Sequence, residues 1–268
     1  MIRDITLGQY YQTEYVIHRL DPRVKLFGSI VFMIMIFLIS DGLTLSFMTL
    51  CLFTVIKLSK VPLSYMLRGL KSIAVLMILT AGFNIFAGEG EAIVSFGVIH
   101  ITWHGIMQAL RVIIRLTYIV MGTSVLTLTT TPNQLTNGME SGLGFLKKIG
   151  VPVHELAMMM SIALRFIPIL TEEADRIMKA QAARGACFDE GRLFDRVKAL
   201  VPVLVPLFVA AFKRAGDLAL AMEARCYNGG EGRTKMYPLV YTRSDRLAYL
   251  LIMIFAVMLT IIFLWGAR

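Results

Sequence analysis

The chain has 268 residues, of which 57% are hydrophobic and 17% charged, and its mean hydropathy is +0.70. These values exclude a soluble globular protein and indicate an integral membrane protein. The net charge of +9 does not indicate a nucleic-acid partner, because the basic residues are spread between apolar segments, as they are in proteins whose membrane spans have positive flanks.

Residues 1–131 are expected to form a membrane domain with four spans. Asp21 followed by Pro22 suits the N-cap and first turn of a helix, so the first span should start there. The four apolar segments are residues 26–40, 43–58, 72–87 and 105–131. The first two contain only 15 and 16 residues, fewer than the roughly 20 that usually cross a bilayer, so we expect them to extend into flanking residues or to lie where the bilayer is thin.

Two connections in this domain have different compositions. The connection after the second span is marked by basic residues, which are Lys57, Lys60, Arg68 and Lys71. Residues 94–103 instead alternate and are rich in β-branched side chains, which favours a short β-hairpin or interfacial strand. His100 lies in this segment and His104 directly after it, without a third ligand nearby, so no metal site is expected.

Residues 132–243 are expected to form a second domain of long helices, followed by a final span in residues 244–268. A short amphipathic helix should open at Pro132. Two long helices then cover residues 152–188 and 192–226, with Pro168 in the first and Pro202 and Pro206 in the second, and prolines inside helices cause kinks. The predicted fold is an all-α integral membrane protein with about five transmembrane helices and these long additional helices.

The long helices end in a repeated sequence, AQAARGACFDEGR at 180–192 and AMEARCYNGGEGR at 221–233. Six of thirteen positions are identical without a gap. Arg184 and Arg225 fall at helix ends, where a cation complements the helix dipole, and two ordinary C-terminal arginines would satisfy that rule alone. The rule does not explain the alanine before each arginine or the matching tails. Alanine would let the helix end enter a groove while the guanidinium reaches a carboxylate at its floor, so the repeat indicates two equivalent docking sites.

The distribution of lysine and arginine predicts the orientation. Basic residues precede the first span and gather between residues 130 and 243, whereas the turn at 41–42 and the loop 88–107 have none. We therefore expect the N-terminus and the repeat region to be cytoplasmic and the C-terminus to lie outside.

The sequence offers little chemistry of its own. It has no GxxxxGK[ST] phosphate loop, so we expect no ATP hydrolysis by this chain, and no cofactor is implied. Arg111 and Arg115 lie one turn apart in the fourth span. They either snorkel or face the bundle interior, or they line a substrate or ion pathway, as in a self-sufficient secondary transporter or channel.

The chain resembles the transmembrane T component of energy-coupling factor (ECF) transporters over essentially its whole length. The segments that carry the resemblance are HRLDPRVK at 18–25, Thr131-Pro132 with Gly138-Met139-Glu140, ALRFIP at 163–168, AQAARG at 180–185 and AMEAR at 221–225. The most specific are the motifs Ala183-Arg184-Gly185 and Ala224-Arg225-Cys226. Because the second motif lacks the family's glycine, we expect its turn to rely on Asn228-Gly229-Gly230.

The resemblance implies an L-shaped protein of the prokaryotic cell membrane, in which residues 132–243 form a cytoplasmic coupling domain. It implies as partners two ATPase subunits, identical or a heteropair, and a small S component that binds a vitamin or a metal ion. In the family the two motif arginines insert into grooves of the ATPases. Five methionines either fill the core or form an adaptable platform for S components; they are Met158, Met159, Met160, Met178 and Met222.

Overall fold

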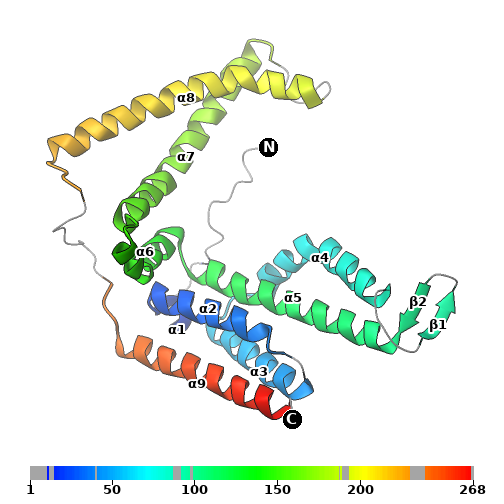
Figure 1. Cartoon of the computed structure of the whole chain (residues 1–268). Coiled ribbons are helices and arrows are strands. Elements are labelled where there is room, and N and C mark those ends of the chain that lie inside the picture. The colour runs from blue at the N-terminus through cyan, green and yellow to red at the C-terminus, as the bar shows by residue number, and fades with distance from the viewer. Residues whose placement is uncertain are drawn as a thin grey trace. The chain divides into compact units, whose positions relative to one another are not determined.

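The structure is a computed structural model that describes residues 11, 15–39, 41–86, 92–96, 99–186, 188, 193–229 and 239–266. It is predominantly helical, as expected for an all-α membrane protein (Figure 1). The chain divides into two compact units. The membrane unit comprises Gly8–Gly138 and Leu239–Arg268, and the long-helix unit comprises Met139–Pro238.

Six helices lie wholly within the membrane unit: α1 (Val16–Arg19), α2 (Pro22–Ile36), α3 (Gly42–Ser59), α4 (Leu63–Phe86), α5 (Trp103–Thr129) and α9 (Arg243–Gly266). Helix α2 begins where the sequence predicts, because the Asp21 side chain accepts a hydrogen bond from the Arg23 N–H at 2.9 Å. Pro22 occupies the first helical position, where its missing N–H leaves no gap in the hydrogen bonding.

The connection between the second and third spans is shorter than predicted. Only residues 60–62 separate α3 from α4, so Arg68 and Lys71 lie inside α4 and not in a loop. Both side chains are exposed, and the Arg68 guanidinium lies 5.0 Å from the centre of the Tyr65 ring. A long basic side chain near a helix end can keep its charge in a polar region while its backbone stays helical. The positions of the charged residues alone therefore predicted the start of α4 too late in the chain.

Six helices of the described chain are long and apolar enough to cross a membrane: α3, α4, α5, α7, α8 and α9. The roughly five membrane spans predicted from the sequence differ from these six helices in two respects. Helix α2 has 15 residues, or about 22 Å of helix, and is too short to qualify. The long helices α7 and α8, which we did not expect to be simple spans, do qualify by length and composition.

The core of the membrane unit lies between α2, α3, α4, α5 and α9. One cluster joins the ends of α3, α4 and α5, and its buried members are Leu52, Ile56, Val61, Met66, Val125 and Leu128. A second joins α2, α3 and α9 through buried Ile36, Met48 and Leu259. Glycines let the helices approach closely: a Cβ at Gly122 of α5 would stand 2.6 Å from the Phe32 ring of α2.

A β-hairpin precedes α5, which confirms the prediction for this segment. Strands β1 (Ala92–Phe96) and β2 (Ile99–Thr102) pair antiparallel, with Phe96 opposite Ile99. In Figure 1 the hairpin lies at the end of the α4–α5 pair. Thr102 then caps α5, because its hydroxyl oxygen accepts the Gly105 N–H at 3.1 Å.

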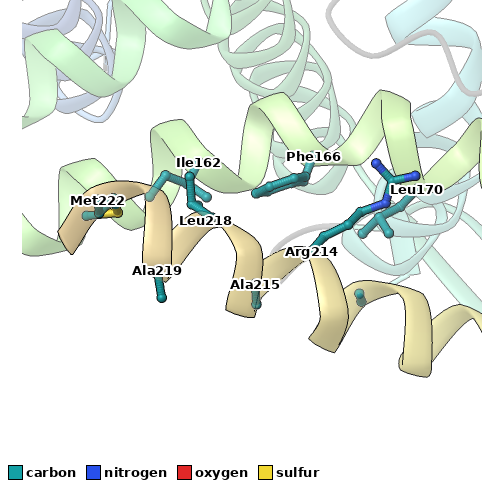
Figure 2. Close-up of a pocket in the computed structure, with 9 residues that line it drawn as sticks. Ile162, Phe166, Leu170, Arg214, Ala215, Leu218, Ala219 and Met222 are labelled. Carbon is teal, nitrogen blue, oxygen red and sulfur yellow. The ribbon is translucent and has the colours of Figure 1, made fainter. Parts of the chain in front are cut away.

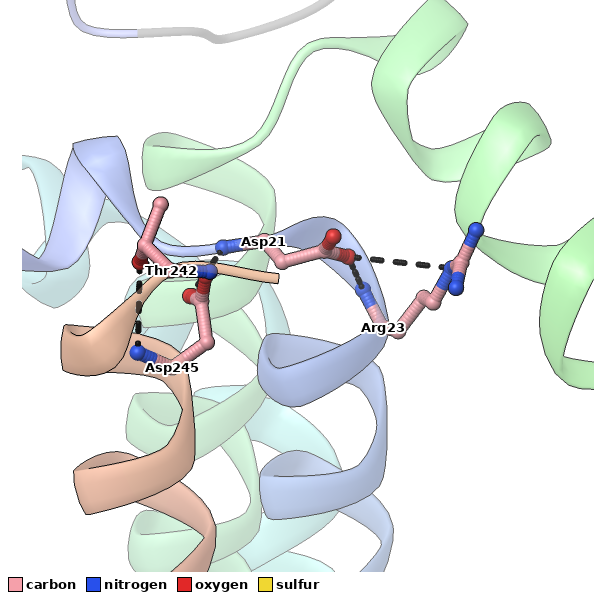
Figure 3. A network of polar contacts seen from close by, with 4 residues as sticks. All are labelled: Asp21, Arg23, Thr242 and Asp245. Carbon is pink, nitrogen blue, oxygen red and sulfur yellow. Dashed lines mark hydrogen bonds and ion pairs between the residues drawn. The ribbon is translucent and has the colours of Figure 1, made fainter. Parts of the chain in front are cut away.

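A buried polar cluster joins the starts of α2 and α9, at residues 224 positions apart in the chain (Figure 3). Asp245 is 1% exposed and accepts the Asp21 N–H at 2.8 Å, the Thr242 N–H at 2.8 Å and the Thr242 hydroxyl at 2.6 Å. The Lys25 ammonium donates to the Thr129 carbonyl at 2.8 Å, which brings in the end of α5. These contacts hold the ends of three helices at one level of the unit.

The long-helix unit contains η2 (Gly144–Ile149), α7 (Val153–Ala183) and α8 (Leu193–Ala224), and α6 (Pro132–Gly142) leads into it. His154 at the start of α7 lies 2.9 Å from a carboxylate oxygen of Glu140 in α6. Pro168 lies inside α7, and Pro202 and Pro206 lie inside α8. Because Pro206 has no N–H, the Pro202 carbonyl loses its helical donor, and it accepts instead from the Gln181 amide at 3.4 Å.

Candidate functional site

The end of α7 is closed by a Schellman motif around the first arginine. Arg184 is the C-cap, the Gly185 N–H donates to the Ala182 carbonyl at 3.0 Å, and the Ala186 N–H donates to the Gln181 carbonyl at 3.0 Å. Gly185 has φ +88°, the left-handed conformation that this motif requires. Arg184 is thus at the helix end, as predicted.

The end of α8 repeats these bonds at equivalent positions. The Cys226 N–H donates to the Glu223 carbonyl at 2.9 Å, and the Tyr227 N–H donates to the Met222 carbonyl at 3.0 Å. Cys226 itself has φ +55°, so it takes the left-handed position that Gly185 takes in the first copy. The expectation that Asn228-Gly229-Gly230 makes this turn is therefore wrong. The Schellman bonds need one left-handed residue directly after the arginine, and a cysteine there costs about 1–2 kcal/mol of backbone strain.

Both arginines are accessible. Arg184 and Arg225 are exposed, and neither guanidinium has an acceptor within the part of the chain that the structure describes. Ala183 and Ala224 before them are exposed too, so each helix tip is narrow beside its cation. The tails of the repeat, Glu190-Gly191-Arg192 and Glu231-Gly232-Arg233, lie outside the described residues.

The two arginines lie at opposite ends of one helix pair. Gln181 near the end of α7 contacts Pro202 near the start of α8, and Arg214 of α8 forms an ion pair of 3.4 Å with Glu173 of α7. Helices α7 and α8 therefore run antiparallel. From Pro202 to Arg225 the α8 axis covers about 35 Å, at about 1.5 Å per residue, which separates the two tips by roughly the width of a small domain.

The five methionines all lie at least partly exposed in the described part of the chain. Met159 and Met160 are about half exposed, and none of the five is buried. Met222 lines a groove of about 310 Å³ between α7 and α8 (Figure 2). The other residues that line the groove are Ile162, Phe166, Leu170, Ala211, Arg214, Ala215, Leu218 and Ala219.

The rival pair of cations lies elsewhere, in the membrane unit. Arg111 is exposed on α5, and the Arg115 guanidinium stacks over Phe37 at 5.4 Å from the ring centre. Of the two histidines in this part of the chain, His100 lies in β2 and His104 in the first turn of α5.

Comparison with known proteins decides the family. The family described as "Cobalt transport protein" (CbiQ) matches residues 13–236. The chain belongs to this family of ECF transporter T components. It is 49% identical to the energy-coupling factor transporter transmembrane protein EcfT of Thermosediminibacter oceani over 249 residues, which are 93% of this chain and 94% of the relative.

Other relatives cover this T component almost completely. EcfT of Acidaminococcus fermentans is 46% identical over 99% of both chains. EcfT of Bacillus subtilis is 45% identical over 97% of this chain and 98% of the relative. The chain is thus a multi-pass membrane protein and a component of a transporter, and its relatives are transport components and not enzymes themselves.

One contact of this T component was missed from the sequence. Glu173 and Arg214, which pair across the helices, stand 41 positions apart, and 41 is also the offset between Arg184 and Arg225. The helices therefore meet there at positions related by the same offset as the two copies of the repeat. Extending the repeat alignment upstream of Ala180 places these two opposite charges at matched positions, which is the signal that the sequence offered for this contact.

Proposed function

We propose that this T component couples ATP hydrolysis by two partner ATPases to a substrate-binding S component, in an importer for vitamins or metal ions. The observation that supports this best is the pair of matched helix ends. Each has the same backbone bonds and presents an exposed arginine, without an acceptor in the described chain, beside an alanine. One such end is a common helix terminus, but two with the same backbone bonds at opposite ends of one helix pair suit two copies of one kind of partner.

The docking chemistry follows from the arginine. Ala183-Arg184-Gly185 and Ala224-Arg225-Cys226 each enter an ATPase groove, where the guanidinium forms a charge-assisted, bidentate bond with a carboxylate. The ATPases are an identical pair or a heteropair. Cross-helix contacts join α7 to α8. A movement of the ATPases that displaces both tips should therefore move the two helices together as one rigid body.

The S component contacts the apolar, methionine-bearing surface of the same helix pair. Met158, Met159, Met160, Met178 and Met222 supply flexible thioethers that can repack against different partner surfaces. The basic residues that precede the first span and gather between residues 130 and 243 support a cytoplasmic position for the N-terminus and the coupling domain, with the C-terminus outside.

The experiment is co-purification of the complex together with vitamin uptake, for Arg184→Ala, Arg225→Ala and the double variant. Each single change leaves a groove carboxylate unpaired, which should weaken that contact by about 2–5 kcal/mol. Arg→Lys restores the charge without the fork and should recover only part of the uptake. Arg176→Ala, an exposed arginine of α7 outside the motif, is the matched control.

The double variant should lose ATPases or uptake while its membrane unit still folds. If the double variant keeps full uptake and both ATPases, the two arginines have no role beyond complementing the helix dipoles. Transport by the chain reconstituted alone would favour instead a secondary transporter or channel that uses Arg111 and Arg115.

A further inference from the structure

The two arginines of α5 form a cationic pair without a counter-charge in the described chain. Arg111 and Arg115 are four residues apart, so they lie on one face of the helix, where like charges repel. No carboxylate of the described residues pairs with either of them. The Arg115 Nε is covered and has no acceptor there. Such a pair, inside a helix that can span a membrane, calls for an anion from outside the described residues.

The depth of this pair can be read from α5. The Lys25 ammonium donates to the Thr129 carbonyl, and we take the polar cluster at the start of α2 as one membrane boundary, at the level of Thr129. At about 1.5 Å per residue, Arg115 lies about 21 Å from that level and Arg111 about 27 Å. The hydrocarbon core is about 30 Å thick, so Arg111 is near the opposite headgroups and Arg115 lies about one to two turns below them.

The α2–α3 hairpin explains why a charge is tolerated at the depth of Arg115. The Arg115 guanidinium stacks over Phe37, the C-cap residue of α2. Irregular backbone such as the turn that follows cannot face hydrocarbon, because its polar groups would be unsatisfied. Because α2 is short, it ends below the usual level of the headgroups, so the polar headgroup region must extend deeper at this point. Arg115 lies beside the end of α2.

We propose that Arg111 and Arg115 bind the phosphate of an anionic phospholipid, drawn down to the tip of the short α2–α3 hairpin. A phosphate accepts bidentate bonds from guanidinium groups, and one phosphate between the two arginines relieves their repulsion. Arg111 is exposed at headgroup depth, where phospholipid phosphates are the abundant acceptors. Trp103, two turns nearer the start of α5 and 62% exposed, belongs with the aromatic residues of a membrane interface.

The sequence makes the site easy to isolate. No other lysine or arginine occurs in residues 26–56 or 72–110, the segments that approach this end of the membrane unit. The test is a titration of the purified full-length chain in detergent with phosphatidylglycerol, phosphatidylcholine or inorganic phosphate, with bound lipid counted by native mass spectrometry. The variants are Arg111→Gln/Arg115→Gln, Arg111→Lys/Arg115→Lys, and the control Arg68→Gln/Arg246→Gln, which removes the same charge elsewhere in the unit.

The wild type and the control should bind phosphatidylglycerol about tenfold or more tightly than the glutamine double variant, with the lysine variant between them. Thermal unfolding confirms that each variant is folded. Three results would overturn the proposal. They are equal phosphatidylglycerol binding by the wild type and the glutamine variant, an equal loss in the control, and displacement of the lipid by inorganic phosphate.

Discussion

Single residues decide whether each arginine is presented at a helix end. The residue after the arginine must adopt the left-handed conformation, and the two copies meet this need with different side chains. Gly185 adopts it without a Cβ, whereas Cys226 adopts it with one at φ +55°. The second helix end is therefore formed at a conformational penalty that the first does not carry.

Exchange of these residues should change stability in opposite directions. Cys226→Gly should stabilise the α8 end by about 1 kcal/mol because it removes the strained Cβ, and Gly185→Ala should destabilise the α7 end by a similar amount. Hydrogen exchange of the last turn of each helix measures both effects. Slower exchange for Gly185→Ala than for the wild type would contradict this account of the caps.

His18 gives the membrane unit a dependence on pH. It is 7% exposed, and burial, with a smaller contribution from the nearby Lys25 charge, lowers the pKa of His18 from its usual 6.5. The unfolded chain therefore binds a proton more readily than the folded one. The stability that neutral His18 contributes is present above pH 6.5 and is lost as the pH falls below that value toward the lowered pKa.

Thermal unfolding at about pH 8 and about pH 5.5 tests this dependence. On acidification the wild type should lose more stability than His18→Gln, whereas His104→Gln, at an exposed position, should follow the wild type. An equal loss of thermal stability in the wild type and His18→Gln would show that His18 does not cause the pH dependence.

Among the elements, α4 and α5 pack most tightly where α5 begins. A Cβ on Gly105 would stand 2.9 Å from the Ile85 carbonyl oxygen and 3.0 Å from that of Asn84, and backbone cannot move aside as a side chain can. Gly105→Ala should therefore destabilise the membrane unit by about 1–3 kcal/mol. Gly82→Ala in α4 has open space around the new methyl and should be neutral or slightly stabilising. Equal unfolding midpoints for the two variants would contradict the close packing.

Local signals in the sequence predicted the elements that local chemistry determines. Asp21-Pro22 fixed the start of α2, Pro132 fixed the start of α6, and alternation predicted the hairpin before α5. The start of α4 was misplaced because Arg68 suggested a loop, although a basic side chain can leave the membrane from within a helix. The bonds of Asp245 with the start of α2 were not predictable, because they join residues far apart in the chain without a shared motif.

The candidate site was predictable to the same extent. The repeat predicted both arginines at helix ends, since duplication is visible in one sequence. The turn at Cys226 was not predicted, because the glycine preference of Schellman motifs is a tendency that about 1–2 kcal/mol can override. The placement of the arginines at opposite ends of one antiparallel pair depends on contacts such as Glu173 with Arg214, which lie upstream of the repeated segments and are not marked by identical residues.

For the whole molecule, the family gives a transporter component and the geometry of α7 and α8 suggests how it works. Two tips about 35 Å apart on one cross-linked helix pair are suited to receive movement from two partners. Neither tip offers chemistry of its own. The function of the two tips therefore depends on what they contact in the assembled transporter.

Photo-crosslinking of the assembled complex tests this contact most directly. A photoreactive amino acid replaces Ala183 or Ala224 at the tips, or Glu172 or Phe212 at exposed control positions on the same helices. We expect Ala183 and Ala224 each to crosslink an ATPase subunit, and much more strongly than the controls, because only the tips enter the ATPase grooves. ATPase crosslinks that are absent at both tips, or as strong at Glu172 and Phe212, would contradict the claim that the arginine-bearing helix ends hold the ATPases.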